Sequence, residues 1–571
     1  MMGAALFCVN IHAHTAAGLC PPVPVPEEFS LSAGVPLPDT WLYSPNAAAL
    51  TRYALADMGT AELSLTKAKG GFTDFSGSPD ALSVDASVAS YFRLGSRAVV
   101  YGSMSYTNFS GHDMAGSTFI PSFSPSRSPQ PATVALPSRH LPFDIVEDSL
   151  TNTGTKHQDT YRLCGGVGYD LCRGFSLGVR MAYTAANMAK YKDLRHKNKL
   201  MDLDLTAGVY LPLTLGKAQT AVGASYLYHR TTESLRFSTY GKSDKVYNSL
   251  IAYANFTGHV EQFGSDGYTD KSREMPLVSD YNGVGIQFSV AKCHSHLSPL
   301  TPHLFFFNSF TYAHRRGYYG RQSPYTITYT GHASHIYQYE ARLSASTGRG
   351  AMFALDLSLS AENLRNDASN YRELQNEQGA TYYEYYSPVK NSNKLWTDGT
   401  VAFTACLGTV AVQSIPKWSL RVGLNWHRRE QTAYVYPFYR RQELHSLEPF
   451  MSIGHNRAVA RSSTAPVWSL ALDFAFLNGR GEPFEDLTFQ QPSDKQELPP
   501  SMDACLWREY EWLTSAQYYV GGTVKYSFVM PATRLRTYAR LSLAHRKANE
   551  CGEYSNGRDR TTATVAIGCD F

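Results

Sequence analysis

Apolar and polar residues alternate along nearly the whole of this 571-residue chain. Between Met201 and Leu211 every second residue is apolar, and the residues between them include Asp202 and Asp204. A period of two places successive side chains on opposite faces of a β-strand, whereas a helix needs a period of 3.6. Several such stretches reach the about 9–11 residues that a tilted strand needs to cross a bilayer. The pattern predicts long β-strands with one apolar face.

Roughly sixteen to eighteen stretches share this pattern, and about eighteen is the best count. They centre on residues 61–75, 84–94, 98–106, 161–171, 175–183, 201–211, 220–228, 284–290, 304–312, 337–345, 353–361, 401–407, 418–427, 447–453, 468–476, 516–528, 535–543 and 563–571. The first of these and the one at 447–453 show the pattern least clearly. We therefore expect an all-β fold.

The connections between these stretches alternate between short and long. The long ones cover residues 113–157, 242–279, 366–396 and 479–508. Transmembrane β-barrels have short periplasmic turns and long extracellular loops, and an even strand number brings both termini to the periplasmic end. A soluble β-sandwich shares the alternation, but it gives no reason for this asymmetry and its strands are usually shorter. The predicted fold is an antiparallel up-and-down transmembrane β-barrel of about eighteen strands.

The composition agrees with a barrel and excludes several other classes. The chain has 52 Lys and Arg against 48 Asp and Glu, so its net charge of +4 indicates no nucleic-acid partner. No run approaches the about 20 apolar residues that a membrane-spanning helix needs. The mean hydropathy of −0.29 is typical of a chain in which apolar and polar residues alternate.

The residues before the first predicted strand divide into two parts. Residues 1–17 contain a short apolar run followed by small residues, as in a secretion signal, although no Lys or Arg precedes the run. The alternative is a disordered leader. Residues 18–58 begin with a proline-rich stretch that cannot form a helix or a central strand, and we expect a periplasmic segment there. The barrel is then expected at 59–571, with the loops at 113–157 and 242–279 as candidates to plug its lumen.

The chain ends on an aromatic residue within an alternating strand. Every second residue back from Phe571 is apolar over residues 563–571. This ending is similar to the C-terminal signal by which outer-membrane proteins are delivered to the barrel-assembly machinery. We therefore expect Phe571 to act as an assembly signal. The protein is expected to be integral to the outer membrane, in contact with its lipid and lipopolysaccharide.

Three features together resemble the large, uncharacterised β-barrels of Bacteroidota outer membranes. The segment Trp41–Ala48, ahead of the first strand, is similar to the Asn-Pro-Ala-like stretch that opens many of those barrels, although here the proline precedes the asparagine. The long loops are rich in tyrosine, and the last strand ends on phenylalanine. The resemblance covers residues 41–571 and implies the location and the fold, with a surface lipoprotein or an import receptor as partner. No TonB-box-like segment or plug domain stands out before the barrel, which argues against an energised receptor.

Charged residues on the polar faces of the predicted strands form the candidate lumen lining. They are Asp202, Asp204, Asp356, Asp473, Glu340, Arg342, Arg180, Arg421, His427, Lys525, Arg536 and Arg540. Charges of both signs on such a wall usually pair across strands or line a pore. An outer-membrane enzyme would need a nucleophile and a base that converge at the rim, and no such set stands out. We predict no enzyme activity, no cofactor and no metal site.

The long loops hold two further candidate features. Cys505 and Cys551 fall in neighbouring loops of an oxidising compartment, which makes them the candidate disulfide pair. A cluster of tyrosines in the loop at 366–396 offers rings that could stack on a sugar or a peptide. It comprises Tyr382, Tyr383, Tyr385 and Tyr386. The plainer interpretation, which we favour, is an aromatic girdle at the membrane interface together with self-packing of the loops.

Two functions fit this barrel best, and a third, a transporter of hydrophobic substrates with a lateral opening, is less favoured. An eighteen-strand barrel is wide enough for an aqueous channel unless loops fill it, so the first hypothesis is a channel or a component of solute uptake across the outer membrane. The alternative is a non-conducting accessory barrel that binds a surface lipoprotein or an import receptor through its large loops. A channel predicts steady ion conductance, whereas an accessory barrel predicts an occluded lumen.

Overall fold

The structure is a computed structural model. It describes Trp41 and residues 44–52, 58–120, 140–147, 150, 152–172, 174–215, 218–240, 246–263, 275–292, 303–323, 326–346, 351–410, 415–460, 464–531, 535–550 and 552–570. These residues are almost entirely β-structure. Within these ranges no helix has both the length and the apolar composition needed to cross a membrane.

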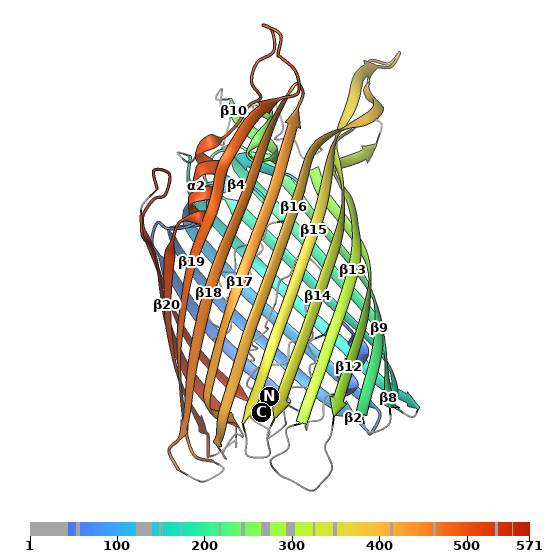
Figure 1. The fold of residues 1–571 in the computed structure, drawn as a ribbon. Helices are drawn as coiled ribbons and strands as arrows, with labels where there is room; N and C mark the ends of the chain where they lie inside the picture. The colour runs from blue at the N-terminus through green and yellow to red at the C-terminus, as the bar shows by residue number, and fades with distance from the viewer. Residues whose placement is uncertain are drawn as a thin grey trace, which may run out of the picture.

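Eighteen antiparallel strands form one sheet that closes into a barrel (Figure 1). They are β1 (Met58–Lys69), β2 (Asp80–Leu94), β3 (Ala98–Met114), β6 (Gly154–Cys172), β7 (Phe175–Lys190), β8 (Arg195–Leu215), β9 (Ala218–Ser238), β12 (Met275–Lys292), β13 (His303–Ser323), β14 (Thr326–Ser346), β15 (Met352–Gln375), β16 (Thr381–Val410), β17 (Ile415–Val435), β18 (Phe438–Ala458), β19 (Val467–Thr488), β20 (Gln517–Val529), β21 (Arg536–Ala548) and β22 (Asp559–Asp570). Each pairs with the next barrel strand along the chain, and β1 pairs with β22. Closure removes the open sheet edge whose backbone groups a membrane could not satisfy.

Every stretch predicted from the alternation corresponds to a barrel strand. The strands are mostly longer than predicted, since β15 has 24 residues and β16 has 30. The long connection expected at 366–396 is therefore wrong, because only residues 376–380 separate these two strands. The connection expected at 479–508 also starts later, since β19 continues to Thr488. Both errors have one cause: these strands continue past the apolar band, where the alternation no longer marks them.

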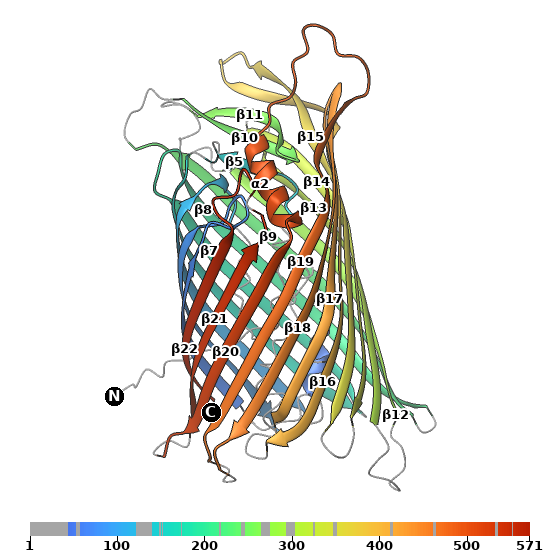
Figure 2. The same cartoon turned by 60° about the vertical axis from the view of Figure 1, so that its left-hand side comes forward.

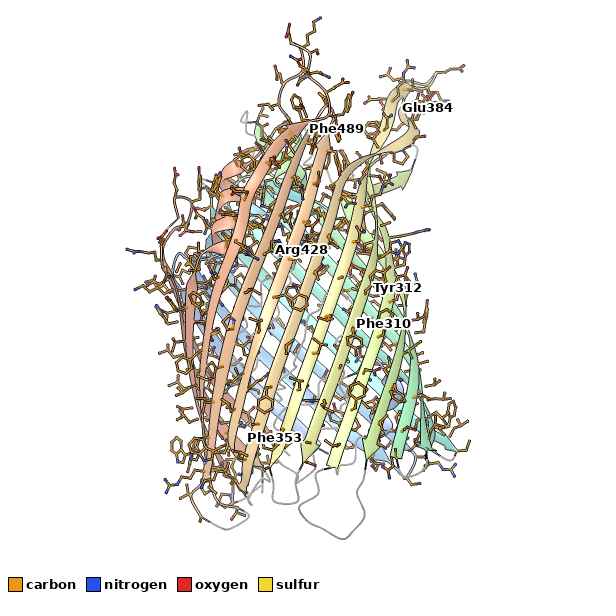
Figure 3. All side chains as sticks on the ribbon, in the orientation of Figure 1. Phe310, Tyr312, Phe353, Glu384, Arg428 and Phe489 are labelled. Carbon is orange, nitrogen blue, oxygen red and sulfur yellow. The ribbon has the colours of Figure 1, made fainter. Side chains whose placement is uncertain are left out.

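The outward side chains of the barrel form an apolar band. On β17 the outward residues Trp418, Leu420, Val422 and Leu424 are between 37% and 48% exposed. Phe353, Phe310 and Tyr312 lie on this outer surface, and Arg428 lies above them, nearer the end of the barrel where β15 and β16 form a tall hairpin (Figure 3). A closed barrel with an apolar outer surface is the form in which β-structure spans a membrane. The chain is a transmembrane β-barrel.

Three long connections close over one end of this barrel (Figure 2). The β3–β6 connection contributes β4 (Gly116–Ser117) and β5 (Asp144–Glu147), and the β9–β12 connection contributes β10 (Tyr247–Ala254) and β11 (Thr257–Phe263). They form one four-stranded sheet in the order β11-β10-β5-β4. The β19–β20 connection adds the helix α2 (Asp503–Thr514). We call this sheet, residues 140–143 that lead into β5, and α2 the lid, and both loops named as plug candidates contribute to it.

The segment before β1 lies against the inner wall at the other end, where the connections are short. It includes the 3-10 helix η2 (Ala47–Arg52), which contacts β6, β7 and β8. The Trp41 ring packs edge-on against Tyr210 and Phe307. We call Trp41 and residues 44–52 the latch. The last residue of β22 pairs with Thr60 near the start of β1, so the C-terminal strand also ends at this short-turn end (Figure 1).

Candidate functional site

A buried charge cluster attaches the lid to one wall of the barrel. Glu147, the last residue of β5, pairs with Lys190 of β7 and lies 2.9 Å from Lys156 Nζ of β6. His196 Nε2 of β8 is 3.4 Å from the same carboxylate, and all four side chains are at most 2% exposed. Burial alone would raise the pKa of Glu147, but Lys156, His196 and Lys190 hold this pKa far below its usual range. Removal of this carboxylate would take its negative charge away from two buried ammonium groups.

A second cluster attaches the lid to another part of the wall. His140, which precedes β5, has its Nδ1 2.6 Å from Glu362 Oε2 of β15. Arg315 of β13 donates a hydrogen bond to the His140 carbonyl oxygen at 2.7 Å, and Ser334 of β14 donates to Glu362 at 2.6 Å. The His140 ring stacks on Trp396 of β16, with 4.5 Å between ring centroids. The chain that enters β5 is thus held on three barrel strands, and Ser334 of β14 supports the Glu362 carboxylate.

Apolar packing fills the space between these two attachments. Phe143 and Ile145 of the lid belong to a buried cluster with Leu235 and Tyr319, which face inward from β9 and β13. The inward position of the two wall residues shows that the lid lies within the barrel mouth and not on top of it. Aromatic and aliphatic side chains of this kind contribute roughly 1.5–3 kcal/mol each when fully buried.

The helix α2 is held against the neighbouring wall by arginines. Arg440 of β18 donates a hydrogen bond to Asp503 at 2.6 Å, and Arg429 of β17 pairs with Glu509. The carboxylate of Asp503 also lies in the first turn of α2, where the helix dipole favours a negative charge. Two of the three connections of the lid, from β3 to β6 and from β19 to β20, therefore use charged side chains to reach the inner wall.

A small cavity remains between the lid and strands β16 and β17. Its volume is about 60 Å³, and its lining includes Phe143, Asp144, Lys394, Trp396 and Glu509. Lys394 Nζ donates a hydrogen bond to the carbonyl oxygen of Leu141 at 3.0 Å, which is a further attachment of the lid. A volume of this order holds a few water molecules and no larger solute. The cavity is a gap in the packing of the lid and not a ligand site.

The latch rests on glycines of the inner wall. A Cβ atom added at Gly178 of β7 would lie 2.3 Å from the Ala47 carbonyl carbon, and one at Gly208 of β8 would lie 2.0 Å from Asn46 Oδ1. At Gly223 of β9 it would lie 2.5 Å from Asn46 Nδ2. Contacts below 3.0 Å are not tolerated, so only glycine allows the latch to lie this close to the strands.

Hydrogen bonds fix the position of the latch on these strands. Asn46 Nδ2 donates to the Val209 carbonyl oxygen at 2.8 Å and to Gln287 Oε1 at 3.1 Å. Trp41 Nε1 donates to Ser289 Oγ at 2.8 Å. The alanines and the leucine of η2 are buried against the wall. Docking of the latch thus combines apolar packing and close backbone approach with amide and indole hydrogen bonds.

All twelve charged residues predicted to line the lumen occupy inward positions on their strands. Several contact a partner on an adjacent strand or, for Arg540, on the strand beyond β22. Arg342 Nε is 2.8 Å from Asp356 Oδ1, and Arg540 Nη2 is 2.8 Å from Glu62 Oε1. His427 Nδ1 is 2.6 Å from an oxygen of Asp398. Such pairs brace a barrel wall, and the contribution of these residues to transport stays a prediction.

A cluster of possible metal ligands lies on the same wall. Asp202 and Asp204 of β8 approach His229 of β9, with Nε2 3.0 Å from Asp202 and Nδ1 3.8 Å from Asp204. The His229 ring stacks on Tyr281, with 4.5 Å between centroids. Each imidazole nitrogen faces a different carboxylate, which is the geometry of a charge brace between strands. A metal would need a single nitrogen and both carboxylates directed at one point, so no metal site is assigned here.

The four tyrosines predicted as a loop cluster lie on the part of β16 that rises beyond the barrel rim with β15, as does Glu384 (Figures 1 and 3). Tyr371 of β15 packs on Tyr383 and Tyr385, with centroids 5.6 and 6.0 Å apart. The self-packing that we expected is present. The girdle expected from the sequence is not formed by these residues, because they stand beyond the apolar band. A role in ligand binding stays a prediction.

The lid anchors were missed in the sequence. Glu147, Lys190 and Glu362 lie far apart along the chain, and their pairing depends on strand register, which no single-strand pattern encodes. Their signal was present only as charged residues at strand ends and inside a long connection. The predicted disulfide cannot be placed, because Cys551 lies outside the described residues. Burial raises the pKa of the Cys505 thiol to about 12. Phe571 also lies outside the described residues.

Residues 47–571 match one protein family, described as a family of unknown function (DUF6850). The chain belongs to this family. The match covers the η2 segment of the latch, the whole barrel and the lid, so all three parts belong to the DUF6850 family region. No curated protein matches the sequence. The expected assignment to Bacteroidota stays a prediction.

Among solved structures, this DUF6850 chain is similar to several outer-membrane receptors. One is FpvA of P. aeruginosa bound to heterologous pyoverdines, at 10% identity and a TM-score of 0.37, over 90% of this chain and 72% of that one. Another is BauA, the ferric preacinetobactin receptor from Acinetobacter baumannii, at 9% identity and a TM-score of 0.37, over 90% of this chain and 80% of that one. The copper transporter OprC matches at 8% identity and a TM-score of 0.32, over 90% of this chain and 80% of that one. These values are too low to transfer any ligand to this chain.

Proposed function

We propose that the protein is a solute-uptake barrel of the bacterial outer membrane whose lumen stays closed until the lid is displaced. The observation that carries this proposal is the attachment of the lid to the inner wall by the buried clusters around Glu147 and Glu362. In this arrangement the end with long connections is extracellular, and both termini are periplasmic. The lid then separates the lumen from the outside medium.

The wall below the lid supports a polar solute. The inward residues carry charges of both signs, among them Arg421, Asp473 and Lys525. A hydrophobic substrate would gain nothing from such a surface, whereas a hydrated one keeps its polar contacts. Cross-strand pairs such as that between Arg342 and Asp356 keep the wall rigid while the lid moves. No enzyme activity forms part of the proposal.

The test is a flux assay on proteoliposomes loaded with a small polar dye. The double variant Glu147→Gln/Glu362→Gln keeps the side-chain shapes but removes the negative charge from both anchors. We expect dye release from the double variant and almost none from the parent. Glu384→Gln is the matched control, because Glu384 is exposed on the tall hairpin away from the lid (Figure 3). A double variant that is folded and equally tight would contradict the proposal.

One observation favours the accessory function as a second candidate. The part of the β15–β16 hairpin above the rim carries exposed aromatic residues, among them Tyr386, which is 47% exposed. Aromatic residues are enriched in protein interfaces, which makes this hairpin the place where a surface lipoprotein or an import receptor would bind. A partner that co-purifies with the parent and is lost on Tyr385→Ser/Tyr386→Ser would support this function. If the parent barrel also conducts, loss of the partner in this variant would show that one protein has both functions.

A further inference from the structure

We infer that the latch is a separable part of the chain. It docks in a groove preformed by glycines on the inner wall, and it leaves this groove while all strand pairs of the barrel stay intact. The groove crosses four adjacent strands. It is lined by Gly166 and Gly168 of β6, Gly178 of β7, Gly208 of β8 and Gly223 of β9. Each of these glycines has a latch atom within 3.0 Å of the place a Cβ would take.

The groove is a feature of the inner face and not of glycine content in general. Gly102 of β3 points outward, and a Cβ added there would meet nothing within 4 Å. Gly165 of β6, which pairs with Gly102 and shares its outward face, would meet only one backbone oxygen, at 3.9 Å. Glycine is therefore required where the latch docks, and its lack of a side chain forms the surface that receives Ala47 and Asn46.

The barrel is complete without the latch. Gly178 pairs with Gly208 in the β7–β8 ladder, and Gly208 pairs with Ser225 in the β8–β9 ladder, without any interruption at the groove. Asn46 bonds to the Val209 carbonyl oxygen, whose second lone pair is free to serve the ladder. The registers of the β7–β8 and β8–β9 ladders show no shift beside the latch. Removal of the latch therefore breaks no strand pair.

The latch also completes its own local structure. The Ser44 amide donates to the Trp41 carbonyl oxygen at 3.0 Å, and the Ala49 amide donates to the Asn46 carbonyl oxygen at 3.1 Å. The Ala48 amide donates to Asn46 Oδ1 at 3.0 Å, which forms an Asx turn. The latch and the barrel wall each form backbone hydrogen bonds of their own, so the latch docks on the wall as a peptide ligand binds in a groove.

Release of the latch widens the lumen at the short-turn end, whereas the lid closes the other end. The docking itself holds whether or not a solute passes, so this inference goes beyond the proposed function. The wider lumen is its consequence for transport, and that consequence alone rests on the proposal of uptake.

The test measures how fast the latch leaves the groove in the full-length protein. Ser44 is 1% exposed, and Ser44→Cys is a nearly isosteric reporter whose modification by a maleimide is followed by mass spectrometry. Gly178→Ala is introduced to expel the latch, and Gly102→Ala is its matched control. Asn46→Ala removes the docking hydrogen bonds without adding an atom.

With Gly178→Ala we expect labelling of the thiol introduced by Ser44→Cys to accelerate roughly tenfold or more, since overpacking raises the population of the released state. Asn46→Ala should accelerate it as well, and Gly102→Ala should not. The barrel should keep its heat-modifiable migration in all variants. Unchanged labelling in both test variants would overturn the inference. Loss of the folded barrel in Gly178→Ala would overturn it too, because the latch would then be integral. The wider lumen is tested separately by dye flux. It predicts a larger flux in Glu147→Gln/Gly178→Ala than in Glu147→Gln alone.

Discussion

The lid and the latch lie at opposite ends of the same lumen and are held there by different means. The lid is held by buried charges, with Glu147 between two lysines and Glu362 beside His140. The latch is held by shape, because Gly178 and Gly208 let it approach the strands more closely than any side chain would allow. Both ends bury apolar residues, so the hydrophobic effect does not distinguish them.

This difference teaches where each end is sensitive. A buried ion pair depends strongly on the presence of both partners, and the loss of one costs about 3–5 kcal/mol. A glycine groove is indifferent to charge but intolerant of one added methyl group, at about 1–3 kcal/mol. The lid should therefore respond to charge-neutralising changes and the latch to added volume. Each prediction below sharpens or breaks this distinction.

The largest expected effect is that of Glu147→Gln on the lid. Ser249 of β10 is 1% exposed, and Ser249→Cys serves as the reporter of lid opening. Because Lys156 and Lys190 lose the Glu147 carboxylate, we expect maleimide labelling of this introduced thiol to accelerate by two or more orders of magnitude, from the about 3–5 kcal/mol at stake. Labelling of the latch reporter in the same protein should not change. Equal acceleration at both reporters would remove the distinction.

A smaller effect is expected for Gly208→Ala at the latch. Its Cβ would lie 2.0 Å from Asn46 Oδ1, so the latch must shift or leave. We expect release of the latch to increase by a factor that corresponds to about 1–3 kcal/mol. The lid reporter should keep its parental rate, which hydrogen–deuterium exchange of β10 would check independently. Exchange that rises in the lid would show that the two ends are coupled.

The pH dependence of flux should be weaker still. The pKa of Glu147 is depressed in the folded protein, so its carboxylate contributes its full stabilisation above the ordinary value for Glu, near 4.3, and this contribution declines as the pH falls from there toward the depressed pKa. We therefore expect no change in dye flux through the parent protein between about pH 8 and 5, and an increase only below about pH 4. Opening near pH 6 would show that histidines and not Glu147 control the lid.

The smallest effect is expected at the rim. Tyr385 is 39% exposed on the hairpin above the barrel. Tyr385→Ala should change the stability of the barrel by less than about 0.5 kcal/mol, as is usual for exposed positions, and should leave both reporters unchanged. Denaturant titration of the gel shift would measure the stability. A large loss would show that the hairpin is part of the closure and not a surface above it.

The barrel itself was predictable from the sequence because its cause is local. Every outward apolar residue, such as Leu420 or Val422, alternates with an inward one, and this period survives in all eighteen strands. The inward positions of residues such as Arg421 and Asp473 followed from the same rule. To predict the number and the order of the strands, it was enough to assume that strands next to each other in the sequence pair, as they do in an up-and-down barrel.

The lid and the latch were not predictable to the same degree. The two connections that build the lid sheet were recognised as candidates to fill the lumen, but β5 and β10 are short and pair across more than 100 residues of sequence. The helix α2 was hidden within an expected loop. The segment around Asn46 was noted for its residue pattern, whereas the glycines that receive it are spread over four strands. Their common role appears only when strand register is known.

The most direct test of the closed lumen is the single-channel conductance of the purified parent protein in planar bilayers. The lid and its two buried anchors predict a folded, membrane-inserted barrel that is silent apart from rare and brief openings. The Glu147→Gln/Glu362→Gln variant should show frequent steps under the same conditions. Steady conductance of the parent protein, at the level of that variant, would contradict the account, because the lid would then not close the lumen.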